Sequence, residues 1–207
     1  WRCRVCRRAR VGAVSAASHF VVDGTPIPGM TGLGTFAEEL ITAESCVVKV
    51  ENDIPLDIVS LIGCGVTTGG GAAINTAGVT PGSSVVVFGC GGVGMSAIQG
   101  ARIAGAAEIL AVDMVDSKLE QAKTFGATHV CKPDDLPQLR TEITGGEGFD
   151  FALECIGNPI TIRATFDAAR RGGTACIVGV GRLTEQVSFS AFELFYSDKN
   201  LRGSMYG

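Results

Sequence analysis

Residues 84–94 read SVVVFGCGGVG, and this stretch decides how the rest of the chain is interpreted. Residues 84–88 form a short apolar run rich in β-branched side chains, which is typical of a buried strand. The run leads directly into a Gly-x-Gly-x-x-Gly pattern, and residues 93–104 then have helical character. A strand, a glycine-rich turn and a helix in this order predict a dinucleotide-binding unit.

Each glycine of the pattern has its own physical reason. Gly89 allows a tight turn, Gly91 lets the backbone approach a pyrophosphate, and Gly94 lets the helix pack closely on the strand. The start of the helix then offers free N–H groups and the positive end of its dipole to the phosphates. The chain has 29 glycines in 207 residues, so the pattern can arise by chance and needs support from its surroundings.

The next apolar run supplies that support, because residues 108–113 end in an acid. Asp113 follows Gly89 by 24 residues, close to the spacing of about 20 at which a carboxylate accepts hydrogen bonds from a ribose. Met114 and Val115 come next rather than an arginine, which favours NAD over NADP. A flavodoxin-like fold with a solvated Asp113 is the alternative.

Downstream, strands and helices alternate. Asp116 is expected to cap the first of these helices. Apolar strands that alternate with helices predict a parallel sheet covered on both faces, and right-handed crossovers make it a doubly wound α/β fold. The expected helices are 117–125, 136–144 and 160–171, and the expected strands are 128–131, 149–155, 174–178 and 200–204.

The region before residue 58 has the turn signals and short Val-rich runs of irregular β structure. Strands are expected at residues 20–22, 35–40 and 46–50. Residues 58–101 contain no charged side chain, but twelve glycines and Pro81 favour buried or loop-forming structure over a membrane span. The first residues lack the apolar core of a signal peptide, so the protein is expected to be cytoplasmic.

Charge and cysteine content narrow the function classes. Residues 1–10 hold five arginines, whereas the remainder has 12 basic and 21 acidic residues, a balance of −9, which disfavours nucleic-acid binding. The eight cysteines show no dense disulfide framework. Cys90, Cys155 and Cys176 lie in or beside apolar runs and are interpreted as small buried hydrophobes.

Residues 60–69, 71–77 and 81–94, together with FDFALECIG at 149–157, resemble the zinc-dependent alcohol dehydrogenases of the medium-chain dehydrogenase/reductase superfamily, in a branch similar to class III. The resemblance implies part of a GroES-like, β-rich, zinc-binding catalytic domain at 1–70 and an NAD-binding Rossmann domain at 71–207. It further implies zinc- and NAD-dependent hydride transfer from a small alcohol, with an S-hydroxymethyl thiol as one candidate. A homo-oligomer is expected for the full-length form.

The resemblance also assigns roles to single residues. Cys64 matches a ligand of the catalytic zinc, and Thr68 a catalytic hydroxyl beside the nicotinamide. From the residues alone Cys64 reads as a buried thiol, because neither His19 nor His129 has a zinc-site spacing from it. The matching cofactor residues are Gly89, Gly91, Gly92, Val93 and Gly94 at the pyrophosphate, Asp113 and Lys118 at the adenosine ribose, and Ile156, Val178 and Val180 at the nicotinamide.

The chain departs from the family pattern as well. In the family, the other catalytic zinc ligands and the proton relay would precede Trp1, so the chain resembles a central fragment that is expected to lack turnover. Cys3 and Cys6 resemble a remnant of a structural zinc site, but the fourth ligand would fall at Val14, and two cysteines cannot complete a tetrahedral site. A non-catalytic dinucleotide-binding fragment and a zinc-free reductase of the same superfamily are the alternatives.

Overall fold

The computed structural model describes residues 20–27 and 47–207, and the chain divides into two compact units, 1–54 and 55–207. In the first unit, strands β1 (Phe20–Val22) and β2 (Thr25–Ile27) form an antiparallel hairpin. Asp23 and Gly24 between them have φ angles of 50° and 76°, as a type I′ turn requires. The strand and turn predicted here are confirmed.

The other two strands predicted in the first unit are not confirmed. Residues 47–50 contain no strand, so the prediction for 46–50 is wrong over the described residues. A strand needs a partner for its backbone N–H and C=O groups, and no described segment pairs with this one. The strand expected at 35–40 lies outside the described residues, as do Cys3 and Cys6.

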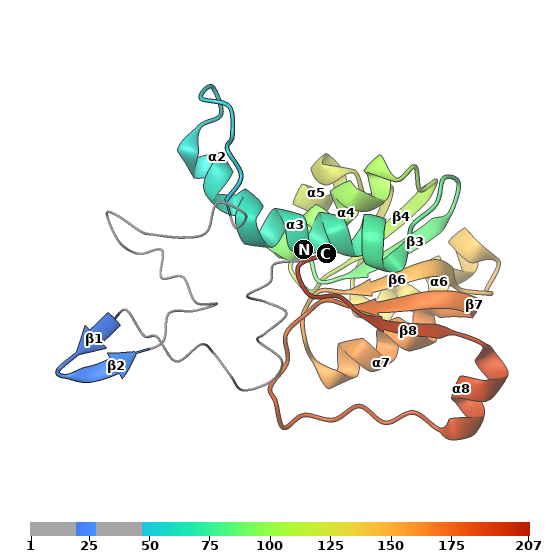
Figure 1. Ribbon diagram of the computed structural model, residues 1–207. Helices are drawn as coiled ribbons and strands as arrows, with labels where there is room; N and C mark the ends of the chain where they lie inside the picture. Colours follow the sequence, from blue (N-terminus) through green and yellow to red (C-terminus); the bar gives the residue numbers. More distant parts are fainter. Residues whose placement is uncertain (1–19, 28–46) are drawn as a thin grey trace. The chain divides into compact units, whose positions relative to one another are not determined.

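The second unit is built on a six-stranded parallel sheet in the order β5-β4-β3-β6-β7-β8 (Figure 1). The chain runs outward from β3 to β5, then returns to the other side of β3 with β6. This is the doubly wound Rossmann order, which confirms the predicted fold and excludes the flavodoxin-like alternative. The strands are β3 (Ser84–Phe88), β4 (Glu108–Val112), β5 (His129–Cys131), β6 (Phe149–Glu154), β7 (Ala169–Ile177) and β8 (Asn200–Gly203).

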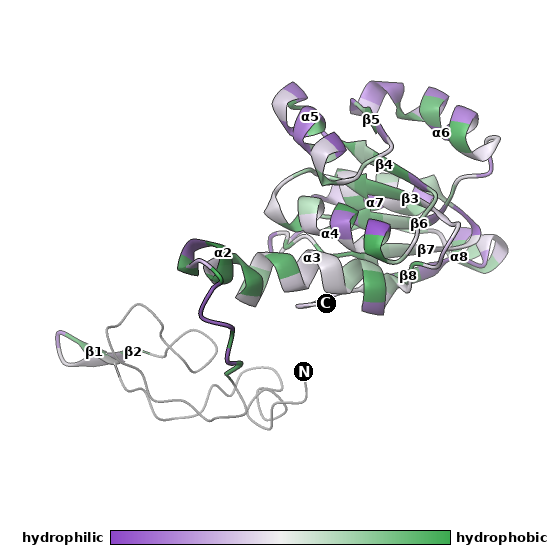
Figure 2. Ribbon diagram, turned by 90° about the horizontal axis from the view of Figure 1, so that it is seen from above, coloured by the Kyte–Doolittle hydropathy of each residue, from purple (hydrophilic) through white to green (hydrophobic). Residues whose placement is uncertain are grey.

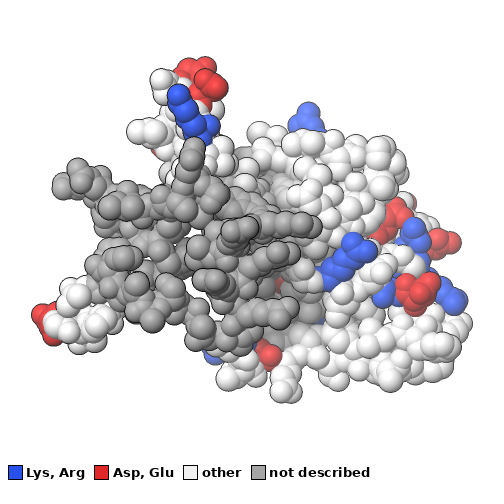
Figure 3. Space-filling model, in the orientation of Figure 1, with Lys and Arg blue, Asp and Glu red and all other residues white. Residues whose placement is uncertain are grey.

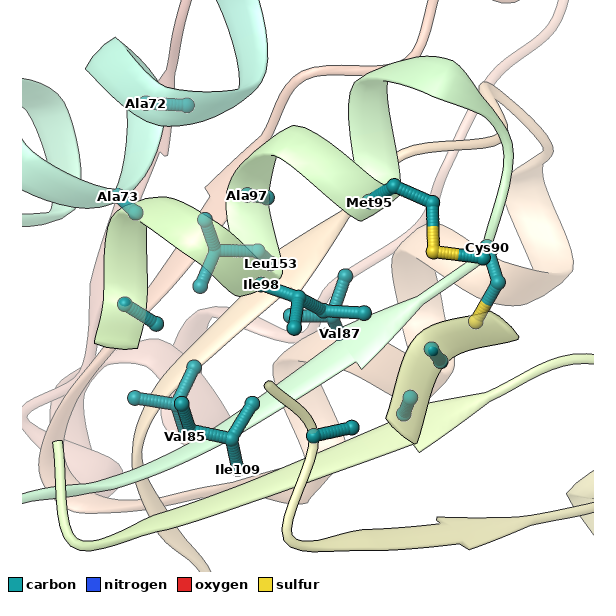
Figure 4. Close-up of a cluster of buried hydrophobic side chains, with 14 of the residues drawn as sticks. Ala72, Ala73, Val85, Val87, Cys90, Met95, Ala97, Ile98, Ile109 and Leu153 are labelled. Atoms are coloured by element: carbon teal, nitrogen blue, oxygen red, sulfur yellow. The ribbon is translucent and has the colours of Figure 1, made fainter. Parts of the chain in front are cut away.

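Helices cover both faces of the sheet. Side chains of β3 alternate between the faces, with Val85 and Val87 in one apolar cluster and Val86 and Phe88 in the other. Figure 4 shows part of the first cluster, where Ile98 of α4 lies over Val87. The sheet helices are α4 (Gly92–Ile103), α5 (Asp116–Phe125), α6 (Leu136–Thr144) and α7 (Pro159–Ala168), and α8 (Ala191–Ser197) precedes β8.

A long helical segment, Leu56–Ala77, precedes the sheet and was not predicted. Ala72, Ala73 and Ala77 are buried in the apolar cluster with α4, whereas Leu56 is exposed. Figure 2 shows that the start of the segment extends away from the sheet and includes hydrophobic residues. By length and composition alone the segment could cross a membrane, which is weak evidence, and the expectation of no membrane span stays a prediction. Its parts are α2 (Leu56–Leu61), a π-helical stretch (Ile62–Val66), α3 (Thr67–Gly71) and a second π-helical stretch (Ala72–Ala77).

Glycine explains how this segment packs. A Cβ at Gly100 of α4 would lie 2.8 Å from the carbonyl oxygen of Gly70, so the two helices meet backbone to backbone. Glycine also lowers helix propensity, which is why the sequence pattern did not predict a helix. The predicted domain division at 70/71 falls inside this segment and stays a prediction, while the compact units divide after Ile54.

Two local predictions are wrong. Val115, not Asp116, is the N-cap of α5, and no side chain caps that helix. Asp116 instead forms an ion pair with Lys132 at 2.9 Å. The helix predicted at 160–171 ends at Ala168, because Ala169 pairs with Phe149 and starts strand β7.

Candidate dinucleotide-binding site

The turn that follows β3 depends on glycine at two positions. Gly89 has a φ angle of +90°, which is strained for any residue with a side chain. A Cβ at Gly94 would lie 1.8 Å from the carbonyl oxygen of Gly89. The first turn of α4 therefore packs directly on the end of the strand, as the motif predicts.

The N-terminus of α4 is open. Gly91 is its N-cap, and no side chain forms a capping hydrogen bond there. The N–H groups of Gly92, Val93 and Gly94 stand in the first turn, where an α-helix provides no acceptor for them. A Cβ at Gly91 or Gly92 would meet no atom within 4 Å. Open space in front of unpaired N–H groups fits an anionic pyrophosphate.

Asp113 lies beside this turn, directly after β4. Its Oδ2 accepts a hydrogen bond from the backbone N–H of Cys90 at 2.8 Å, and its Oδ1 accepts one from Val115 at 3.0 Å. Lys118 approaches the same carboxylate, with Nζ 3.9 Å from Oδ2. A carboxylate has about four lone-pair positions, so Asp113 retains capacity to accept hydrogen bonds from a ribose.

The loops after β6 and β7 border the turn on its other side. A Cβ at Gly89 would lie 2.5 Å from Cγ1 of Ile156, so this side chain covers the turn. Ile156 is half exposed and Val180 fully exposed, whereas Val178 belongs to the apolar core. Of these three side chains, Ile156 and Val180 offer surface to a ligand.

Helix α3 reaches the same turn from a distant part of the sequence. A Cβ at Gly69 would lie 2.1 Å from the carbonyl oxygen of Val93. Thr68 precedes this contact and is half-buried. Tertiary packing thus places Thr68 near the turn, about twenty residues earlier in the chain.

Cys64 lies one helical turn before Thr68, in the first π-helical stretch, and is exposed. Its carbonyl oxygen accepts a hydrogen bond from Thr67 Oγ1 at 3.2 Å. Across residues 20–27 and 47–207, no three His, Cys, Asp or Glu side chains gather closely enough to hold a metal ion. Catalytic zinc needs three protein ligands, so these residues alone do not fit a zinc site, and Cys64 stands as a single donor.

Several other thiols are enclosed by the sheet and its helices. Cys90, Cys131 and Cys176 are buried, as predicted for Cys90 and Cys176, whereas Cys155 is half-buried. Burial raises the pKa of Cys90 to about 12 and the pKa values of Cys131 and Cys176 to about 11. These groups are protonated thiols near neutral pH and act as apolar core.

Comparison with known proteins identifies the family. The family model described as zinc-binding dehydrogenase matches residues 92–207, more than half of the chain. The chain belongs to the zinc-binding dehydrogenase family. The matched region begins at the first residue of α4 and contains every strand after β3.

Individual relatives agree with this assignment. Class-3 alcohol dehydrogenase of Caenorhabditis elegans is 36% identical over 218 residues, which cover 98% of this chain and 56% of the relative. Benzyl alcohol dehydrogenase of Acinetobacter calcoaceticus has a TM-score of 0.79 and 38% identity over 85% of this chain and 49% of its own. A zinc-binding dehydrogenase of Sinorhizobium meliloti, solved with NADP bound, has a TM-score of 0.62 and 27% identity over 68% of this chain and 42% of its own. The chain spans about half the length of the relatives it matches.

One buried residue beside the glycine turn, Glu154, was not predicted as part of the site. Glu154 ends β6 and is fully buried beside the turn. An acidic residue that closes an otherwise apolar run was the signal that could have found it.

Proposed function

We propose that this chain binds NAD across the carboxyl ends of β3 and β4 and forms the cofactor-binding part of a zinc-dependent alcohol dehydrogenase. The observation that carries the proposal is the open, uncapped N-terminus of α4 beside the Asp113 carboxylate. Family membership and relatives that are alcohol dehydrogenases support the reaction class. That reaction is hydride transfer between a small alcohol or aldehyde and the nicotinamide.

The roles proposed for this chain's residues follow the geometry. The N–H groups of Gly92, Val93 and Gly94, with Gly91 leaving room in front of them, bind the pyrophosphate. Asp113 accepts hydrogen bonds from the adenosine ribose, and Lys118 adds a cation beside it. The nicotinamide lies against the loops that carry Ile156, Val178 and Val180, with Thr68 at its edge.

NAD is proposed over NADP because a 2′-phosphate would meet the Asp113 carboxylate. The side chain of Asp113 is 11% exposed, so its charge is poorly screened by water, whereas Lys118 is 45% exposed and 3.9 Å away. The relative solved with NADP shows that NADP also occurs among zinc-binding dehydrogenases. Titration with NAD and NADP decides the preference, and equal affinities would refute it.

Zinc is proposed through Cys64 as one ligand, and the chemistry it supplies when bound is Lewis-acid activation of the substrate oxygen. Any zinc that the purified protein carries is expected to fall with Cys64→Ser, measured by mass spectrometry. The same variant is expected to retain NAD affinity within about threefold, a change of less than about 0.7 kcal/mol. Unchanged zinc in the variant would remove Cys64 from the metal site.

A non-catalytic dinucleotide-binding protein is the second candidate, favoured by the lack of a three-ligand metal cluster among the described residues. Because the chain spans about half the length of its relatives, zinc content and NADH formation with short alcohols are measured on the full-length form, where they distinguish the two. In that form zinc-dependent NADH formation supports the dehydrogenase, whereas NAD binding without zinc or turnover supports the binding module. A folded chain that binds neither NAD nor ADP-ribose would refute both.

The remaining proposals concern location and partners. We propose a cytoplasmic protein that forms a homo-oligomer and does not bind nucleic acid or membranes. On the face drawn in Figure 3, acidic and basic side chains of the described residues are interspersed. The acidic balance of residues 11–207 supports the absence of nucleic-acid binding.

A further inference from the structure

Glu154 is the only acidic or basic side chain that is buried among the described residues, with an exposed fraction of 0%. It ends β6, the strand that pairs with β3 at the point where the strand order reverses. Burying a carboxyl group is costly unless hydrogen bonds compensate. The buried carboxyl group of Glu154 must therefore be stabilised by specific hydrogen bonds.

Its carboxyl oxygens bind the loop that follows. Oε1 accepts hydrogen bonds from the backbone N–H groups of Ile156 at 3.1 Å and Gly157 at 2.9 Å, and Gly157 also reaches Oε2 at 3.0 Å. The hydroxyl of Thr161, in the first turn of α7, donates to Oε1 at 2.6 Å. The side chain thus defines the path from β6 into α7.

The backbone of the same residue holds a second loop. The carbonyl oxygen of Glu154 accepts hydrogen bonds from the N–H groups of Val178 at 2.8 Å and Gly179 at 2.9 Å. The two loops touch, because a Cβ at Gly179 would lie 2.1 Å from the backbone nitrogen of Gly157. One buried residue therefore ties together the loops after β6 and β7.

These loops face the second half of the cofactor site. Asp113 stands on the first half of the sheet, and a doubly wound sheet binds one mononucleotide on each half. The nicotinamide half consequently belongs at the ends of β6 and β7. Ile156 joins the halves, since its side chain covers Gly89 of the pyrophosphate turn.

We propose that Glu154 is a positioning residue that holds the 155–157 and 178–181 loops as one platform for the nicotinamide half of the cofactor. The inference rests on the proposed NAD-binding function. Glu154 has no exposed surface and so does not touch the cofactor itself. It acts through the backbone of Ile156 and Gly157.

The test compares NAD with ADP-ribose, which lacks the nicotinamide. Glu154→Ala in the 207-residue chain is expected to weaken NAD and NADH binding by about tenfold and ADP-ribose binding by less than about threefold. Glu154→Gln keeps one acceptor oxygen for the two backbone N–H groups and the Thr161 hydroxyl. This variant is expected to restore the wild-type ratio of NAD affinity to ADP-ribose affinity. The fluorescence of bound NADH reports the nicotinamide environment directly and should move toward that of free NADH only in the alanine variant.

A second pair of variants keeps the test decisive if Glu154→Ala fails to fold. Thr161→Val removes one donor to the carboxyl group and should lower NAD affinity relative to ADP-ribose by about threefold. Thr165→Val is its matched control, because this buried hydroxyl donates to the Thr161 carbonyl oxygen on the same helix and not to Glu154.

The outcomes separate the inference from the function on which it rests. The positioning role would be overturned if Glu154→Ala weakened NAD and ADP-ribose binding equally. It would also be overturned if both Glu154→Ala and Thr161→Val kept the wild-type ratio of NAD affinity to ADP-ribose affinity. Wild-type chain that binds neither ligand would instead overturn the proposed function.

Discussion

The backbone N–H of Cys90 donates a hydrogen bond to the Asp113 carboxylate over 2.8 Å and joins the turn after β3 to the end of β4. The two strands are parallel neighbours in register, with Phe88 opposite Val112. The N–H of Gly89 adds a bond to the Val112 carbonyl oxygen at 2.8 Å. The turn proposed to bind the pyrophosphate and the carboxylate proposed to bind the ribose are therefore held together at one edge of the sheet.

Alanine at two glycines of the turn should separate binding from folding. Gly91→Ala meets no atom within 4 Å, so its free energy of unfolding should change by less than about 1 kcal/mol. Its NAD affinity should fall by about tenfold, because the new methyl group occupies the approach of the pyrophosphate.

Gly94→Ala is the matched comparison, since its Cβ would lie 1.8 Å from the Gly89 carbonyl oxygen. The free energy of unfolding should fall by about 3 kcal/mol. Urea denaturation and NAD titration of both variants check the pair. A stable Gly91→Ala protein with normal NAD affinity would place the pyrophosphate elsewhere.

Asp113→Asn should reduce the preference of the protein for NAD over NADP. The amide oxygen can still accept the Cys90 hydrogen bond, while the negative charge that opposes a 2′-phosphate is lost. We expect NADP affinity to rise by about fivefold or more relative to NAD, measured by calorimetry. Asp116→Asn is the control, because that exposed carboxylate pairs with Lys132 and should leave the ratio unchanged. An equal change of the NADP-to-NAD affinity ratio in Asp113→Asn and Asp116→Asn would contradict a specific role for Asp113.

Thiol labelling should distinguish Cys64 from the core cysteines. Cys64 is exposed, whereas Cys176 is buried and burial raises its pKa to about 11. Because the thiolate is the reactive form, Cys64→Ser should remove one rapidly modified thiol at pH 8, and Cys176→Ser should remove none. Mass spectrometry after brief alkylation counts the modified sites. Rapid modification of Cys176 in the folded protein would contradict the structure.

Asp150 should make stability depend on acid pH. Burial opposes its ionisation, but hydrogen bonds from the Ser84 N–H and hydroxyl and from Arg170 outweigh burial and lower the pKa of Asp150. Because the folded-state pKa lies below the unfolded value of about 3.9, the stabilisation is present above that pH. It is lost as the pH falls through the folded-state pKa.

Asp150→Asn should therefore reduce the free energy of unfolding at pH 7 by about 1–2 kcal/mol and flatten its decline below pH of about 4. Urea denaturation between neutral and acid pH measures both effects. Asp134→Asn, at an exposed position, is the control. Identical acid profiles for the wild type and Asp150→Asn would exclude this contribution.

The sequence by itself determined the Rossmann sheet and its glycine turn. Residues 84–94 carry this information locally: a β-branched apolar run specifies a buried strand, and Gly89 and Gly94 occupy positions where no side chain fits. The position of the Asp113 carboxylate beside the turn was also predictable. Parallel strands end at the same edge of the sheet, and Asp113 has the spacing from the glycine pattern that is typical of the second strand's end.

Only the tertiary structure decided what depends on distant segments. Residues 56–77 are helical although five of them between 63 and 71 are glycine, because Gly70 packs against Gly100 of α4 and the close contact offsets their low helix propensity. Strand β7 begins at Ala169 because Ala169 pairs with Phe149 of β6, and Arg170 also bonds Asp150 of that neighbouring strand. The position of Glu154 likewise depends on backbone N–H donors of the loops after β6 and β7, which meet only after folding. The local hydrophobic pattern of a sequence does not indicate such long-range contacts.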